Sequence, residues 1–178
     1  MDMKTAAFVA TTLSFIFCIA AVKWHVAPWL RRIGRVDALA PLLWIHVARC
    51  VALQIYSAQS AGLPVPDGIR DQIAYGDVLT ALLAFVSIIL LRYRVSIAVP
   101  AVWIMSVVGI LDLLNAMAGG IKTEMFDHAS GVTWLILTFY VPVLWVTHIL
   151  IVWQLVSRCG EPLGTRPHDE SEHCGRIR

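Results

Sequence analysis

Long apolar runs alternate with short polar or turn-rich stretches along most of the chain. Five of these runs reach the roughly 17–25 residues that an α-helix needs to cross the hydrocarbon core of a membrane. They cover residues 5–22, 39–62, 75–91, 95–117 and 131–156. This pattern predicts an all-α, multi-pass integral membrane protein, in which a bundle of five transmembrane helices forms one domain over residues 1–157.

The composition supports a lipid environment for these runs. The chain is 58% hydrophobic and 15% charged, whereas soluble domains are about 45–50% apolar and about 25% charged. The expected partner is therefore the lipid bilayer, and no nucleic-acid partner is expected. The abundance of Ala, Val, Leu and Arg is typical of a bacterial inner (cytoplasmic) membrane protein.

Basic residues alternate between the segments that separate the apolar runs. The second and fourth loops carry one each, Arg70 and Lys122. The first and third loops and the start of the tail are richer, with Lys23, Arg31, Arg32, Arg35, Arg92, Arg94 and Arg158. Because positive loops favour the cytoplasmic side, the sequence predicts an external amino terminus and a cytoplasmic carboxyl terminus.

The first apolar run also permits a second interpretation. Residues 1–21 resemble a cleaved signal peptide, with Lys4 near the start and small residues, Ala20 and Ala21, at the end. Cleavage would place the basic first loop outside and break the alternation of charge. The charge pattern therefore favours retention of this segment as a membrane span.

The first loop has an amphipathic pattern of its own. Trp24, Trp29, Ile33 and Val36 share one helical face, and most of the arginines lie off it. Tryptophan and arginine in this arrangement are typical of a short helix at the level of the lipid headgroups. The sequence therefore predicts an interfacial helix between the first two spans.

The carboxyl tail differs from the rest of the chain. Residues 158–178 are polar and rich in Pro and Gly, which predicts a disordered cytoplasmic tail. Its Cys159, His168, His173 and Cys174 match no usual zinc spacing, so no metal site is predicted.

A small set of polar side chains interrupts the spans. Ionisable groups in hydrocarbon are costly unless they are paired or hydrated, so they are candidates for function. The candidate ligand-binding residues are His46, Arg49, Tyr56, Asp77, Asp112, Asn115 and His148. Depth along the spans places the two histidines in an inner layer and the two aspartates in an outer one. Arg49 lies between the layers, and whether it pairs with Asp77 or Asp112 is open.

Helical periodicity assigns faces to these groups. At about 100° per residue, one side of the second span carries His46, Arg49, Cys50, Leu53, Tyr56, Ser57 and Ser60. The third span presents a face of Asp77, Thr80, Ala81, Ala84 and Ser87. Because polar stripes must face the bundle interior in lipid, we expect both faces to be buried.

Three functions are compatible with this set. The first is binding, accessory or transport-related, with Arg49 holding the head of a lipid or small anionic ligand, alone or with a membrane-protein partner. The second is a b-type haem protein with His46 and His148 as axial ligands. The third is an intramembrane lipid-modifying enzyme that uses Asp112 and a histidine. No catalytic motif is present, so the sequence favours a non-enzymatic role.

Overall fold

The computed structural model describes residues 2–159, and this part of the chain is helical without strands. Five helical segments are long and apolar enough to cross a membrane, as the hydrophobic pattern predicts. They cover Met3–Leu30, Arg35–Ser60, Asp67–Arg92, Ala98–Lys122 and Gly131–Ser157. The predicted tail lies outside the described residues from position 160 onward.

Three of these segments combine more than one type of helical turn. The first joins α1 (Met3–Ala21), the π-helical η1 (Val22–Val26) and α2 (Ala27–Leu30). The second joins α3 (Arg35–Val47), the 3₁₀-helical η2 (Ala48–Gln54) and α4 (Ile55–Ser60). The fifth joins α8 (Gly131–Leu135), the π-helical η3 (Ile136–Tyr140) and α9 (Val141–Ser157). The remaining helices are α5 (Asp67–Arg92), α6 (Ala98–Lys122) and the short α7 (Met125–His128).

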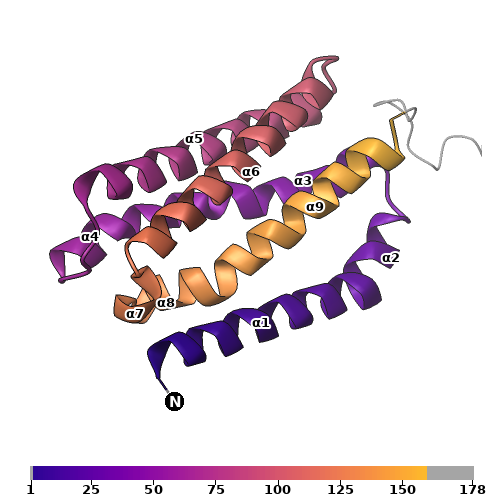
Figure 1. The fold of residues 1–178 in the computed structure, drawn as a ribbon. Coiled ribbons are helices and arrows are strands. Elements are labelled where there is room, and N and C mark those ends of the chain that lie inside the picture. Colours follow the sequence, from indigo (N-terminus) through magenta and orange to yellow (C-terminus); the bar gives the residue numbers. More distant parts are fainter. Residues whose placement is uncertain (1, 160–178) are drawn as a thin grey trace, which may run out of the picture.

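The helices run lengthwise beside one another in an elongated bundle (Figure 1). The amino terminus lies at the same end as the α4–α5 connection and α7, and α9 ends at the opposite end. Helices α3, α5, α6 and α9 form the centre of the bundle. Helix α1 lies at its edge against α9, η3 and α7, and Ala7 is its only buried residue.

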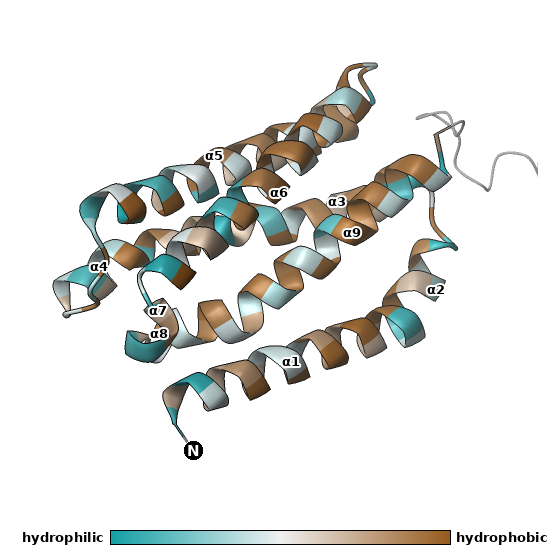
Figure 2. Ribbon diagram, in the orientation of Figure 1, coloured by the Kyte–Doolittle hydropathy of each residue, from teal (hydrophilic) through white to brown (hydrophobic). Residues whose placement is uncertain are grey.

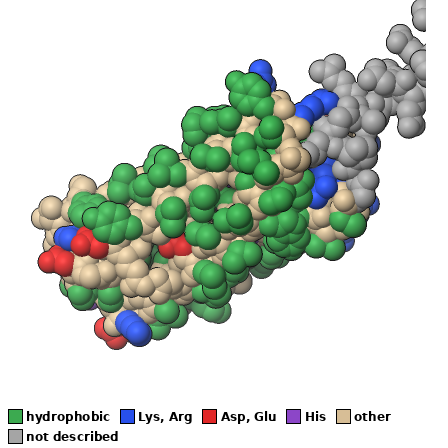
Figure 3. Space-filling model, turned by 90° about the horizontal axis from the view of Figure 1, so that it is seen from above, with side chains coloured by type: hydrophobic (Ala, Val, Ile, Leu, Met, Phe, Trp, Pro, Cys, Tyr) green, Lys and Arg blue, Asp and Glu red, His purple; other side chains and the backbone are tan. Residues whose placement is uncertain are grey.

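Apolar side chains fill the interior and also cover the outside. The main core is built on α3, α5, α6 and α9, and includes Leu39, Leu43, Met105 and Ile151. Hydrophobic residues also follow the outer faces of the helices (Figure 2). Charged side chains gather mainly at the two ends of the molecule (Figure 3). An apolar belt between polar ends is the surface expected of a protein that lies in lipid.

The prediction of a separate interfacial helix between the first two spans is wrong. Trp24 and Trp29 belong to the end of the first long helix, which continues to Leu30. Pro28 does not stop this helix, because a π turn precedes it, in which the Ala27 amide bonds to the Val22 carbonyl. The connection to Arg35 is therefore only a short turn.

The other helices extend beyond or shift from the predicted bounds of the apolar runs. The third begins at Asp67 rather than at 75, since Pro66 precedes it and Ile69 and Ile73 pack on an apolar cluster. The fourth covers Ala98–Lys122 rather than 95–117, because a turn with left-handed Arg94 precedes it. The second begins at Arg35, and the fifth ends at Ser157. Polar residues on either side of an apolar run can continue its helix, so the apolar run alone does not show where the helix begins and ends.

Candidate functional site

The middle of the second span is a tight 3₁₀ helix that carries Arg49 into the bundle. His46, one turn earlier, and Arg49 are fully buried. The predicted polar stripe ends there, because Cys50, Ser57 and Ser60 are exposed. A 3₁₀ helix turns about 120° per residue instead of about 100°, so its seven residues rotate the following face by about 140°. The stripe prediction beyond Arg49 is therefore wrong.

Arg49 joins three helices through its guanidinium group. Its Nε donates to Asp77 Oδ1 on α5 at 2.5 Å, and its Nη2 donates to Asp112 Oδ2 on α6 at 2.5 Å. Its Nη1 donates to the Gly109 carbonyl at 3.3 Å. Arg49 thus binds both aspartates, between which the sequence offered a choice. Asp77 lies well inside α5, ten residues after its first residue, Asp67.

Two glycines make room for these side chains. A Cβ on Gly76 would overlap the Asp112 carboxylate. A Cβ on Gly109 would lie 2.7 Å from His148 Cε1 and 2.8 Å from Thr80 Cγ2. The small-residue face predicted for α5 is buried throughout, from Asp77 to Ser87. Close helix approach at glycine and alanine therefore brings the polar groups together.

The two inner histidines contact each other. The ring centroids of His46 and His148 are 4.0 Å apart, with an interplanar angle of 46°. His46 Nε2 lies 3.1 Å from Thr147 Oγ1. Both rings are fully buried. Axial ligation requires two imidazoles on opposite sides of a porphyrin, so rings in direct contact do not fit the haem hypothesis.

Two of the candidate residues lie away from Arg49. Tyr56 donates to Asp71 Oδ1 at 3.0 Å, and the Arg70 guanidinium lies 4.6 Å from the centre of its ring. Asn115 is exposed on the outer face of α6. Their expected place beside Arg49 is wrong, for Tyr56 because of the rotation within η2. Asp112 itself lies at the edge of the buried face of α6, whose centre is toward Gly109 and Leu113, and Asn115 lies about 60° farther from that centre.

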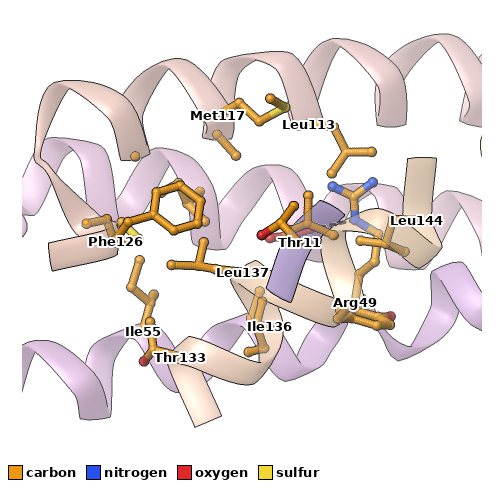
Figure 4. Close-up of a pocket in the computed structure, with 18 of the residues that line it drawn as sticks. Thr11, Arg49, Ile55, Leu113, Met117, Phe126, Thr133, Ile136, Leu137 and Leu144 are labelled. Carbon is orange, nitrogen blue, oxygen red and sulfur yellow. Dashed lines mark hydrogen bonds and ion pairs between the residues drawn. The ribbon is translucent and has the colours of Figure 1, made fainter. Parts of the chain in front are cut away.

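An apolar cavity of about 180 Å³ lies beside Arg49. Thr11, Leu113, Met117, Ile136, Leu137 and Leu144 are among its lining residues, which come from α1, α6 and the fifth span. Arg49 lies toward one end and Phe126 toward the other (Figure 4). Asp77 and Tyr140 also line it. No periodicity in the sequence marks this cavity, because its walls come from helices distant along the chain.

The cavity adjoins a more open pocket between α1 and the α6–α7 region. Thr11, Gly120, Ile121 and Phe126 line both hollows. At the rim of the outer pocket, Lys4 Nζ lies 2.8 Å from Asp127 Oδ2 and 3.9 Å from Glu124 Oε1. The outer pocket thus adjoins the cavity beside Arg49 on the side of α1, at the end of the molecule that holds the amino terminus.

Within residues 2–159, no three His, Cys, Asp or Glu side chains lie close enough together to hold a metal ion.

No curated protein and no solved structure gave a significant match to the chain. Residues 6–156 match the model of a family described as a domain of unknown function, DUF8737. The match includes every residue of the Arg49 and histidine clusters. The five-helix chain with this buried polar centre belongs to the DUF8737 family.

Proposed function

We propose that this protein is an integral membrane protein that binds a small cationic amphipathic molecule inside its helical bundle. The observation that carries the proposal is the apolar cavity with Arg49 and Asp77 at one end. A cavity of about 150 Å³ lined by apolar side chains accepts a molecule the size of benzene. The cavity here suits a short apolar chain or ring, and the adjoining pocket can hold the rest of the ligand.

The charge of the site selects the head of the ligand. Arg49 contributes one positive charge against the two carboxylates of Asp77 and Asp112, so the cluster carries a net charge of −1 when both carboxylates are ionised. The Nε and Nη2 atoms of Arg49 already donate hydrogen bonds to the two aspartates, so they are not available to a ligand. An anionic head would face excess negative charge, whereas an ammonium group would be attracted to Asp77. This balance of charge supports a ligand with a cationic head rather than the anionic head considered from the sequence.

Membrane orientation follows from the charges at the ends of the bundle. The end that holds the loop 31–34, the loop 93–97 and the end of α9 carries most of the arginines. The opposite end carries Lys4, Arg70 and Lys122, together with acidic residues that include Asp127. Under the positive-inside rule, the amino terminus is outside and the carboxyl terminus cytoplasmic. The cavity then opens on the external side.

Cysteine labelling tests this orientation. Ser96 and Ser130 are exposed in turns at opposite ends of the bundle, and each accepts Ser→Cys with little change in size. In a variant without the native cysteines, a membrane-impermeant maleimide added to intact cells should label S130C and leave S96C unlabelled until the membrane is permeabilised. Labelling of S96C alone would reverse the topology, and equal labelling of both would contradict it.

Ligand binding is tested by filling the cavity. Ala116 lines it, whereas Ala118 on the same helix is exposed, so Ala116→Phe and Ala118→Phe form a matched pair. We expect protein in lipid nanodiscs to bind decyltrimethylammonium more tightly than decanoate in equilibrium dialysis, with empty nanodiscs as the blank. Ala116→Phe should abolish this binding, and Ala118→Phe should preserve it. Asp77→Asn should weaken it about tenfold, as expected for loss of one charged contact.

Two results would contradict the proposal. One is equal binding of decyltrimethylammonium and decanoate, which would show that the charge of the site does not select the head. The other is unchanged binding to the Ala116→Phe variant, which would place the ligand elsewhere.

A further inference from the structure

Two sites in the described part of the chain place one arginine between two aspartates. At the end of the bundle, the side chains of the two aspartates that pair with Arg70 are 78% and 37% exposed, so water can solvate their excess negative charge. In the interior, Arg49 pairs with Asp77 and Asp112, whose side chains are only 11% and 8% exposed. The same ratio of charges therefore meets water at one site and very little water at the other.

The buried cluster of Arg49, Asp77 and Asp112 lacks one positive charge when both carboxylates are ionised. An uncompensated charge away from water is strongly unfavourable, so a buried group takes up a proton instead. Two carboxylates that share one site cannot both ionise as easily as two separate ones, and the proton that they bind belongs to the pair. One proton on the two carboxyl groups would bring the cluster to neutrality.

Each carboxyl group has an oxygen that can carry this proton. Arg49 donates to Asp77 Oδ1 and to Asp112 Oδ2, whereas no hydrogen bond from the described residues reaches Asp77 Oδ2 or Asp112 Oδ1. A proton on either of these oxygens thus leaves both contacts with the guanidinium in place. The small remaining exposure of both side chains lets water accept from the protonated group. Asp77 also lines the cavity beside Arg49, so the pair borders the place assigned to the ligand.

The other titratable groups beside this cluster do not compensate its charge. Tyr140 on η3 lines the cavity, but its hydroxyl already donates to a backbone carbonyl. His148 on α9 packs on Gly109, whose carbonyl accepts from Arg49 Nη1, and His46 on α3 packs on His148. Burial and the positive guanidinium both disfavour a further positive charge on these imidazoles. The residues of α1 that line the cavity carry no titratable side chain. The aspartates are therefore the groups that can take up the proton.

From these observations we infer that Asp77 and Asp112 together hold one proton while the cavity is empty, and that a cationic ligand displaces this proton when it binds. The inference rests on the proposed function for its ligand, but the proton site itself does not. The proton neutralises the cluster in the empty state, and the cation does so in the bound state. One positive charge enters and one proton leaves to the solvent, so the cluster stays neutral. Ligand affinity consequently weakens as the pH falls, because proton and ligand oppose each other reciprocally.

The proton site is tested first without any ligand. Ordinary aspartates are ionised above about pH 5, so a protonated aspartic acid between about pH 5 and about pH 7 identifies the pair. Infrared spectra in a maltoside detergent, which has no carbonyl group, should show a carboxylic acid C=O band that shifts when aspartate is labelled with ¹³C. Asp77→Asn and Asp112→Asn should each remove the band, because the remaining carboxylate balances Arg49. Asp71→Asn, beside Arg70, should leave it unchanged. Absence of the band from the unmodified protein, or its persistence in Asp77→Asn and Asp112→Asn alike, would overturn the inference.

The pH dependence of binding then tests the exchange. In phosphatidylcholine nanodiscs, the Kd for decyltrimethylammonium should rise about tenfold for each pH unit by which the pH falls while the pair is protonated, as exchange for one proton requires. Asp112→Asn should bind the probe more weakly but with a Kd that does not depend on pH, because Arg49 and Asp77 alone are neutral. An unchanged pH dependence in Asp112→Asn, or no pH dependence in the unmodified protein, would overturn the exchange. Absence of probe binding would refute the proposed function and the competition with it, and the infrared result would still decide the proton site.

Discussion

Replacing Arg49 by alanine will lower the free energy of unfolding by about 3–5 kcal/mol, the range found when one partner of a buried ion pair is removed. The change leaves the carboxylates of Asp77 and Asp112 without their shared cation, and it also frees the Gly109 carbonyl. Thermal unfolding of the purified protein in mild detergent, followed by circular dichroism, measures the effect as a large fall in Tm.

A matched control separates burial from charge. Arg70 also pairs with two aspartates, Asp67 and Asp71, but at the end of the bundle, where both carboxylates are partly exposed. Arg70→Ala should change stability by less than about 1 kcal/mol. Adding Asp77→Asn and Asp112→Asn to Arg49→Ala should recover part of the lost stability, because no unpaired charge then remains. Equal Tm values for Arg49→Ala and Arg70→Ala would contradict the structural role of Arg49.

Gly109→Ala is expected to have the second-largest effect on stability. Its Cβ would lie 2.7 Å from His148 on one side and 2.8 Å from Thr80 on the other. Neither neighbour can move freely, because His148 packs on His46 and the Thr80 hydroxyl bonds to the Gly76 carbonyl at 2.9 Å. Helices α5, α6 and α9 must therefore separate, at a cost of about 1–3 kcal/mol, as in other overpacked interiors.

Gly120 provides the comparison on the same helix. A Cβ there meets no atom within 4 Å, so Gly120→Ala should leave Tm unchanged or raise it slightly through the better helix propensity of alanine. Removing the opposing ring in Gly109→Ala with His148→Ala should relieve one of the two clashes. If Gly109→Ala and Gly120→Ala melt at the same temperature, the close helix approach described at Gly109 is wrong.

The local hydrophobic pattern of the sequence was enough to predict the membrane helices. A backbone in hydrocarbon must satisfy its hydrogen bonds within each segment, so the length of an apolar run indicates a membrane helix without knowledge of its neighbours. The face of α5 from Asp77 to Ser87 could be predicted for a related reason, since this helix is regular along its length. The exact ends could not, because polar residues from Asp67 onward continue α5 beyond the apolar run.

The composition of the site was decided only by the tertiary structure. Periodicity could place His46 and Arg49 on one face, but the 3₁₀ turn between Ala48 and Gln54 then rotates Tyr56 away from them. Whether Arg49 meets Asp77, Asp112 or both depends on how closely three helices approach, and Gly109 sets that distance. The contact of His46 with His148 and the cavity beside Arg49 likewise arise from residues that only packing brings together. Sequence periodicity is a local property of one helix, whereas a site between helices depends on their relative rotation and separation.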